Sequence, residues 1–166
     1  METPRRPEPD ATETSSRTEE AKDLEFVLER ELPPLIPALE YPAVFVKAER
    51  PRPFGRPEVV LWFKILPAAT ATDELTAGVE LPYHCPAQPN GRFAPSSNYA
   101  RAWQIAAGRR PTRKDRLSVA VFRHRLLRVK VRTVIVDNRR RPLAESTYYS
   151  VIDRLVGVDA ARDLEP

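Results

Sequence analysis

The chain of 166 residues is poor in several residue types, and each shortage rules out a class of protein. Cys85 is the only cysteine, which excludes an intramolecular disulfide or a cysteine-based zinc site and favours a reducing compartment. The five glycines form neither a phosphate-binding loop nor a dinucleotide-binding pattern. No apolar run approaches the length that crosses a bilayer, and the first residues lack the apolar stretch of a signal peptide. We therefore expect a cytoplasmic protein that does not enter a membrane.

Side chains suited to catalysis or metal binding are also few. His84 and Cys85 are adjacent, so on a strand they would point to opposite faces and would chelate a common metal poorly. A nuclease needs clustered carboxylates to hold Mg²⁺, whereas the acidic residues after Glu40 are mostly scattered in loops. We predict that the protein is not an enzyme and uses neither a metal nor a cofactor.

Charge is distributed unevenly along the chain. Its 27 basic and 23 acidic residues give a net charge of +4. Residues 1–40 contain 5 basic and 11 acidic residues, so the remainder contains 22 basic and 12 acidic residues, a net charge of +10. Residues 92–141 contain 15 basic and 2 acidic residues, and such a field attracts polyanions. A basic surface kept for solubility is the alternative, but this excess favours an anionic partner.

Composition divides the chain into four segments. Residues 1–22 are polar and rich in Pro, Thr and Glu, so we expect a disordered tail. Residues 23–40 are predicted as a short helical and proline-rich leader. Residues 41–156 are predicted to form the folded domain, and residues 157–166 a C-terminal tail.

Alternation with period two, in segments rich in β-branched and aromatic residues, predicts five strands. They cover residues 41–49, 58–66, 79–85, 125–136 and 148–155. The link over residues 50–57 contains the Pro and Gly of a turn and makes the first two strands a hairpin. Pro82 cannot donate to a strand ladder, which places the third strand at an edge.

A helix is predicted over residues 98–107, capped by Ser96 or Ser97 and ended by Gly108. Trp103 lies on its apolar face, and we expect it in the core. A short second helix is predicted over residues 115–122.

The predicted order is therefore β-β-β-α-β-β, in a mainly β protein with one or two helices. This is the order of the five-stranded OB-type barrel, which binds oligonucleotides across strands two and three and between the 1–2 and 4–5 loops. Both loops are rich in arginine. Their predicted contacts to nucleic acid are Arg50, Arg52, Phe54, Arg56, Arg139, Arg140 and Arg141.

The strands add further predicted contacts, because a single-strand site combines rings that stack on bases with cations that follow phosphates. If Val59, Leu61, Phe63 and Ile65 fill the barrel, Trp62 and Lys64 point outward. In the alternative, Trp62 packs beneath the N-terminal segment. Tyr83 adds a stacking surface or is buried.

The fourth strand has two different faces. One is apolar and comprises Leu127, Val129, Val131, Thr133 and Ile135. The other is the cationic stripe of Arg128, Lys130 and Arg132. Like charges repel, so three cations without interleaved acids suggest an anionic partner. The alternative is an exposed face whose charges discourage aggregation.

Four segments also carry a resemblance: residues 44–50 (VFVKAER), 54–56 (FGR), 97–103 (SNYARAW) and 129–134 (VKVRTV). Over residues 41–155 the chain resembles small proteins encoded on bacterial plasmids and integrative elements, whose strand order is similar to that of OB-type single-stranded-DNA-binding proteins. The resemblance implies a role in replication, recombination or transfer of a mobile element. The C-terminus lacks the aromatic-ended acidic tip of well-known bacterial single-strand binders, which puts recruitment of partners through that tip in doubt.

The sequence thus predicts a non-catalytic protein that binds single-stranded DNA through phosphate contacts and base stacking. Duplex DNA or RNA is an alternative ligand. A protein–protein adaptor in a DNA-processing complex, with replication or recombination proteins as partners, is the alternative of a different class. The oligomeric state does not follow from the sequence.

Overall fold

The structure, a computed structural model, describes residues 32–67 and 76–159. The chain divides into two units, Met1–Glu31 and Leu32–Pro166, and the described residues belong to the second. The predicted tail over residues 1–22 and most of the predicted leader therefore lie outside the described residues, as do residues 160–166.

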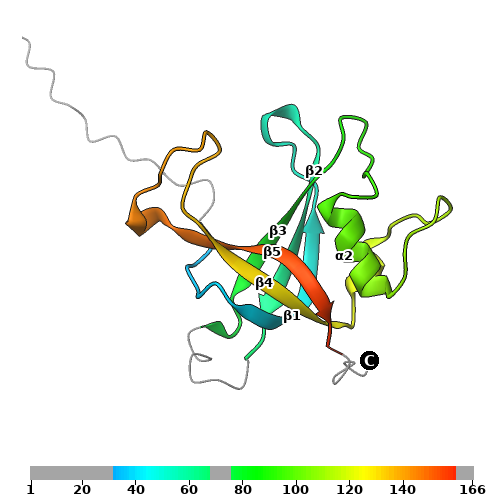
Figure 1. The fold of residues 1–166 in the computed structure, drawn as a ribbon, viewed down its shortest axis with the longest axis horizontal. Helices are drawn as coiled ribbons and strands as arrows, with labels where there is room; N and C mark the ends of the chain where they lie inside the picture. Colours follow the sequence, from blue (N-terminus) through cyan, green and yellow to red (C-terminus); the bar gives the residue numbers. More distant parts are fainter. Residues whose placement is uncertain (1–31, 68–75, 160–166) are drawn as a thin grey trace, which may run out of the picture. The chain divides into compact units, whose positions relative to one another are not determined.

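One antiparallel sheet in the order β3-β2-β1-β4-β5 forms the domain (Figure 1). Its strands are β1 (Glu40–Glu49), β2 (Glu58–Ile65), β3 (Glu80–Pro86), β4 (Leu126–Val134) and β5 (Tyr149–Val158). The strands β3 and β5, at the two ends of this order, lie against each other without pairing as a ladder. The sheet is thus rolled into a partly open barrel of the OB type, and the predicted β-β-β-α-β-β order is confirmed.

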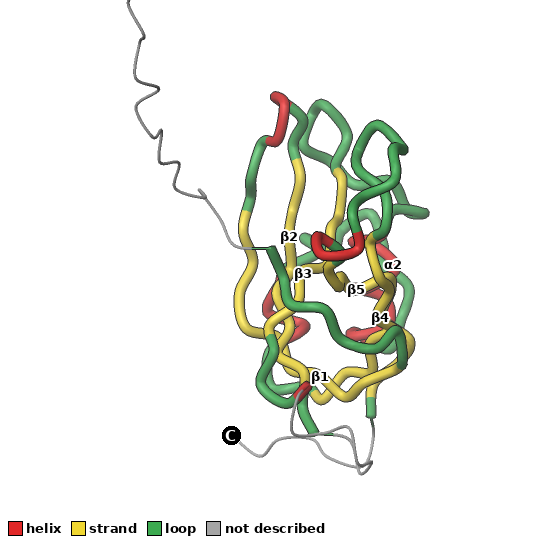
Figure 2. The backbone as a smooth tube through the Cα atoms, turned by 90° about the vertical axis from the view of Figure 1, so that its left-hand side faces the viewer, coloured by secondary structure: helices red, strands yellow, loops and turns green. Residues whose placement is uncertain are grey.

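β1 joins the two halves of the barrel (Figure 2). It pairs with β4 over Glu40–Val44, and with β2 from Ala43 to Glu49 with a bulge between Phe45 and Lys47. β4 thus pairs with β1 only as far as Val44. Beyond that point the second edge of β1 runs beside the connection between the helix and β4, and this placement creates the groove described below.

Alternating side chains of β2 fill the barrel as predicted. Val59, Leu61, Phe63 and Ile65 are buried, and together with residues of the other strands and the helix they form one core. Phe122 lies at its centre, with ring centroids about 6 Å from those of Phe45, Phe63 and Tyr99. Removing such a ring typically costs roughly 3–5 kcal/mol of stability.

The helix α2 (Asn98–Ala107) confirms the predicted bounds. Ser97 is its N-cap and accepts a hydrogen bond from the backbone of Ala100 at 3.2 Å. Gly108 ends the helix with φ of 68°, a left-handed conformation that glycine adopts without strain. Trp103 is 6% exposed and belongs to the core, as predicted. No helix within the described ranges is long and apolar enough to span a membrane.

The predicted second helix is wrong in extent. Only η2 (Val119–Phe122), a single 3-10 turn, forms in that region. The carboxylate of Asp115 accepts hydrogen bonds from the backbone and side chain of Thr112, which holds the preceding residues in a turn. The segment therefore begins without regular secondary structure and becomes helical only at η2, where Phe122 enters the core.

The predicted fourth strand (residues 125–136) is too long, and Ile135 was wrongly assigned to its buried apolar face. β4 ends at Val134, which is buried, whereas Ile135 is 51% exposed. The reason is the turn that follows: the carbonyl of Ile135 already accepts a hydrogen bond from Leu143, and Val136 bridges to Pro142.

The segment before β1 closes one side of the core. Ile36 is buried, and its backbone N–H donates to Ser150 Oγ at 2.9 Å. Ser150 Oγ donates in turn to the carbonyl of Ile36 at 3.0 Å. The packed domain therefore includes residues that precede Tyr41.

Candidate nucleic-acid interface

A groove follows the edge of β1 that is not paired with β4, and the α2–β4 connection (residues 108–125) forms the opposite wall along most of its length. At the end near the β1–β2 loop, the opposite side comes from residues 87–93 instead. The groove consists of three adjoining hollows of about 190, 370 and 650 Å³. The middle hollow shares Arg50, Val59 and Phe93 with the first and Ala48 and Val119 with the third, so neighbouring hollows have wall residues in common. We call them together the β1 groove.

Basic side chains greatly outnumber acidic ones in the lining of the β1 groove. They are Lys47, Arg50, Arg52, Arg116, Arg123, His124 and Arg125. Among the described residues, Glu58 is the one carboxylate that lines it, and that carboxylate lies 3.0 Å from His84 Nδ1. The groove therefore has a strong excess of positive charge.

Among the described residues, five groove arginines have no acidic partner, in contrast to the ion-paired Arg109, Arg128, Arg132 and Arg141. No ion pair joins Arg50, Arg52, Arg116, Arg123 or Arg125 to a carboxylate within the part of the chain that the structure describes. All except the half-buried Arg125 are exposed. Their charge is therefore available to an anionic ligand.

The floor of the middle hollow is apolar and well supported. The half-buried ring of Phe93 stacks on Tyr99, with centroids 4.4 Å apart and planes at 20°. The hydroxyl of Tyr99 donates to the carbonyl of Leu117 at 2.7 Å. Burial raises the pKa of Tyr99 to about 12, so this hydroxyl remains a donor at any physiological pH. The floor and the far wall are thus joined by one short hydrogen bond.

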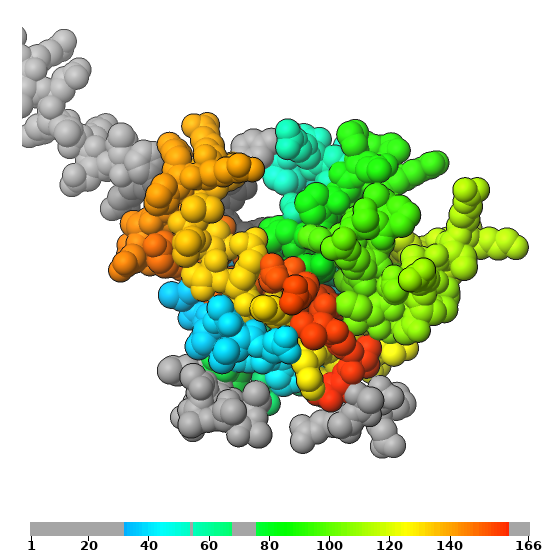
Figure 3. Space-filling model, in the orientation of Figure 1, coloured from blue at the N-terminus to red at the C-terminus, as the bar shows by residue number. Residues whose placement is uncertain are grey.

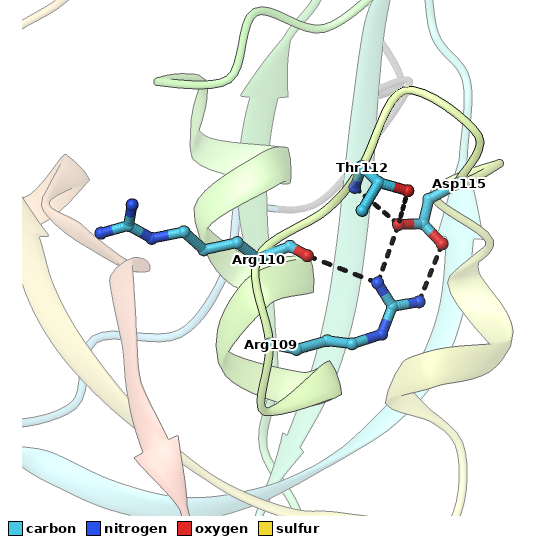
Figure 4. A network of polar contacts seen from close by, with 4 residues as sticks. All are labelled: Arg109, Arg110, Thr112 and Asp115. Carbon is cyan, nitrogen blue, oxygen red and sulfur yellow. Dashed lines mark hydrogen bonds and ion pairs between the residues drawn. The ribbon is translucent and has the colours of Figure 1, made fainter.

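A polar network fixes the α2–β4 connection (Figure 4). Arg109 donates two hydrogen bonds of 2.8 Å to the two carboxylate oxygens of Asp115, and Thr112 donates its backbone N–H and its hydroxyl to the same carboxylate. The hydrogen bonds from Arg109, and then that from the Thr112 backbone, hold the pKa of Asp115 well below its usual value. Because Arg116 is the next residue, this network holds the wall where Arg116 meets the groove.

The loop between β1 and β2 supplies part of the predicted site. Arg50 and Arg52 line the groove, whereas Arg56 is exposed but does not line it. Phe54 belongs to η1 (Pro53–Gly55), and its side chain is outside what the structure describes.

Trp62 and Lys64 point away from the core, as predicted from the alternation on β2. Trp62 is half-buried, and the ammonium of Lys47 lies 5.3 Å from its ring centroid. Lys47 also lines the groove and is 2.8 Å from Glu49. Trp62 is not among the described residues that line the three hollows, and its link to the groove is this contact with Lys47.

Tyr83 requires a correction, because its ring is not a stacking surface. It is 3% exposed, and its hydroxyl donates to the carbonyl of Asn98 at 3.3 Å. Burial raises its pKa above the ordinary value. The alternative that the sequence left open, a buried Tyr83, is the observed one.

The cationic stripe of β4 also requires a correction, because the sequence indicated three cations with no acids between them. Arg128 and Arg132 are exposed, but Arg128 lies 3.5 Å from Asp159 and Arg132 lies 3.5 Å from Asp153. Lys130 is half-buried and stands opposite Glu40 of β1. Acids are therefore interleaved with the stripe, although they come from outside β4 and were not visible in its sequence.

The β4–β5 loop is separate from the groove. It rises from the same end of the barrel as the β1–β2 loop but stands apart from it (Figures 1 and 3). Asp137 organises the loop by accepting hydrogen bonds from the backbones of Arg139 and Arg141, and its side chain is 2.7 Å from the guanidinium of Arg141. Arg139 and Arg140 are exposed and have no ion pair within the described residues.

The sequence missed the residues of the far wall and of the floor. Arg116, Arg123 and Arg125 contribute to the basic excess of residues 92–141, but Arg116 fell in the predicted helix and Arg125 in the predicted fourth strand, so the sequence did not place the three on one wall. Phe93 lies in a loop, where no periodicity indicates its direction. The signal that could have located the wall is its composition, since residues 108–125 contain seven Lys or Arg and one acid, Asp115.

His, Cys, Asp and Glu side chains in residues 32–67 and 76–159 form no group of three or more that could hold a metal ion. Comparison of the chain with family models, with curated proteins and with solved structures finds no match. The resemblance to proteins of mobile elements therefore stays a prediction, and the geometry of the β1 groove carries the functional argument.

Proposed function

We propose that the protein binds single-stranded nucleic acid, DNA in the first place, in the β1 groove. The observation that carries this proposal is the set of groove arginines without carboxylate partners, on two facing walls. A strand's phosphates replace the missing counter-charges, and the release of their condensed counterions drives binding.

The groove favours a single strand over a duplex for a chemical reason. Its floor is apolar and contains the supported ring of Phe93. Only an unpaired base can present its face to such a ring while its phosphates reach the cations beside it. A duplex or an RNA helix would contact the arginines but would leave the floor unused.

An adaptor function is the second candidate, and it rests on the edge of β1. Val46 lies at the bulge and is 41% exposed, and the backbone of β1 beyond Val44 is not paired with β4. An acidic peptide could add to this edge as a strand between the same cations. For either function, we propose that the protein acts in the cytoplasm, in replication, recombination or transfer of a mobile element. Its protein partners would then be those of these processes.

Fluorescence anisotropy of the full chain with labelled oligo(dT), a matched duplex and a matched RNA, each at several salt concentrations, tests the proposal. Each neutralised phosphate of a single strand contributes about 0.7 to the slope of log affinity against log salt. Five or so contacts should give a slope of about −3 to −4. A slope near zero, or preference for the duplex, would contradict the proposal, and competition by an acidic peptide alone would favour the adaptor.

A further inference from the structure

We infer that the middle hollow of the β1 groove is a nucleotide pocket, in which one base lies against Phe93 and its phosphates contact Arg50 and Arg116. This inference rests on the proposed function and names the part of the ligand that the groove recognises. It also locates the recognition away from the outer face of β2 and β3, where the sequence placed it.

The support behind Phe93 is the first argument. A ring that stacks on a base must be held in place before the base arrives, since ordering it during binding reduces affinity. Tyr99 covers one side of Phe93 at 4.4 Å and is itself anchored by its hydrogen bond to Leu117. Phe93 nevertheless remains only half-buried and lines two adjoining hollows. The ring is therefore supported by Tyr99 and still partly accessible.

The chemistry of the hollow is the second argument. Its volume of about 370 Å³ lies within the range of small-molecule sites. Its apolar lining is Ala48, Val59, Leu117 and Val119. Arg50 comes from the end of β1 and Arg116 from the facing wall, and no carboxylate lines this hollow among the described residues. A flat ring with an attached anion satisfies both parts of such a site, and a nucleotide has that composition.

The other aromatic rings are less available, which is the third argument. Trp103 and Phe122 are buried, and Tyr83 is too. Trp62 carries Lys47 over its ring. Of the other described aromatic side chains that line the groove, Tyr99 is buried and Phe45 packs against Phe63 and Phe122. Phe93 is therefore the best placed to receive a base.

Oligo(dT) and an abasic deoxyribose-phosphate strand of equal length separate base recognition from phosphate recognition. The wild-type chain should bind oligo(dT) roughly 5- to 100-fold more tightly than the abasic strand, which corresponds to one stacked base. Phe93→Ala should lose a similar factor with oligo(dT) and should no longer distinguish the two strands. Phe93→Tyr is the matched control and should keep the preference, while the melting temperature of each variant reports its folding.

The outcomes separate this inference from the proposed function. Equal binding of both strands by the wild-type chain would overturn the base pocket and leave the phosphate groove intact. If neither strand binds at low salt, the proposed function is wrong, and a titration with thymidine monophosphate then decides the pocket. Shifts of the NMR signals of Phe93 with the free nucleotide would assign the pocket to a mononucleotide, and unchanged signals would overturn it.

Discussion

Two basic regions of this domain have similar composition and different ion pairing. In the first region, which comprises the exposed face of β4 and the β4–β5 loop, Arg128, Arg132 and Arg141 each lie within 3.5 Å of an aspartate. In the β1 groove, Arg50, Arg116 and Arg123 have no such partner among the described residues. A count of charges along the chain does not distinguish these regions.

The difference indicates what each set of charges does. An exposed ion pair contributes roughly 0–1 kcal/mol to stability, so the paired arginines act mainly on local geometry. Unpaired cations that lie close together repel one another, and this repulsion is unfavourable for the folded protein until an anion binds. The unpaired set is therefore the better candidate for ligand binding, although it is less regular in sequence than the stripe on β4.

The largest expected effect comes from removing three groove charges at once. The triple variant Arg50→Ala/Arg116→Ala/Arg123→Ala should bind oligo(dT) at least roughly tenfold more weakly at low salt, and its salt slope should fall by about 2. The matched variant is Arg128→Ala/Arg132→Ala/Arg141→Ala, which loses the same net charge. Anisotropy at several salt concentrations should find its slope close to that of the wild type. Equal losses in both variants would mean that only total charge matters.

An intermediate effect is expected where the network of Figure 4 holds the groove wall. Asp115→Asn removes a negative charge, so electrostatics alone would make it bind a strand more tightly. Loss of the contact to Arg109 should instead loosen the wall beside Arg116 and weaken binding roughly two- to tenfold. Asp153→Asn, which removes the partner of Arg132, is the charge-matched control and should bind slightly more tightly.

The pH dependence of strand binding provides a second test of the role of Asp115. The pKa of Asp115 is lowered, so its contribution is present above the ordinary aspartate pKa of about 3.9 and is lost only as the pH falls through its lower folded value. The ratio of wild-type to Asp115→Asn affinity should therefore be constant from pH 5 to pH 8. If Asp115→Asn and Asp153→Asn both bind the strand more tightly than the wild type, Asp115 does not position the groove wall.

The smallest effect is expected in the β4–β5 loop. Arg139→Ala/Arg140→Ala removes two exposed cations away from the groove and should weaken binding by less than about threefold, with stability changed by roughly 0.5 kcal/mol or less. Arg141→Ala should leave affinity unchanged, because its guanidinium is held by Asp137. Binding curves and melting temperatures of both variants measure these effects. A tenfold loss in the double variant would move the centre of the site to this loop.

The barrel could be predicted because its signals are local. Alternation on β2 determined which side of the strand enters the core, and Ser97 with Gly108 determined the ends of α2. The turn around Asp115 depends on Arg109 six residues earlier, in competition with a helical pattern, and was missed. The end of β4 depends on the fold of the following turn and was also missed.

The candidate site was predictable only in part. Arg50 and Arg52 follow from the order of elements, since the loop after β1 flanks the binding face in an OB-type barrel. The pairing of Arg128 with Asp159 joins residues 31 positions apart, so no inspection of β4 itself could find it. Phe93 acquires its significance from its stacking on Tyr99, which is a tertiary contact.

NMR mapping of bound oligo(dT) on the ¹⁵N-labelled full chain tests the central claim most directly. The account predicts that the largest amide and guanidinium shifts cluster at Lys47–Arg52, Phe93 and Arg116–Arg125, on both walls of the groove, with weak shifts at Arg139 and Arg140. Signals of Arg128 and Arg132 should remain nearly unchanged. Large shifts centred on Arg128, Arg132 and Arg141, with the groove residues unmoved, would contradict it.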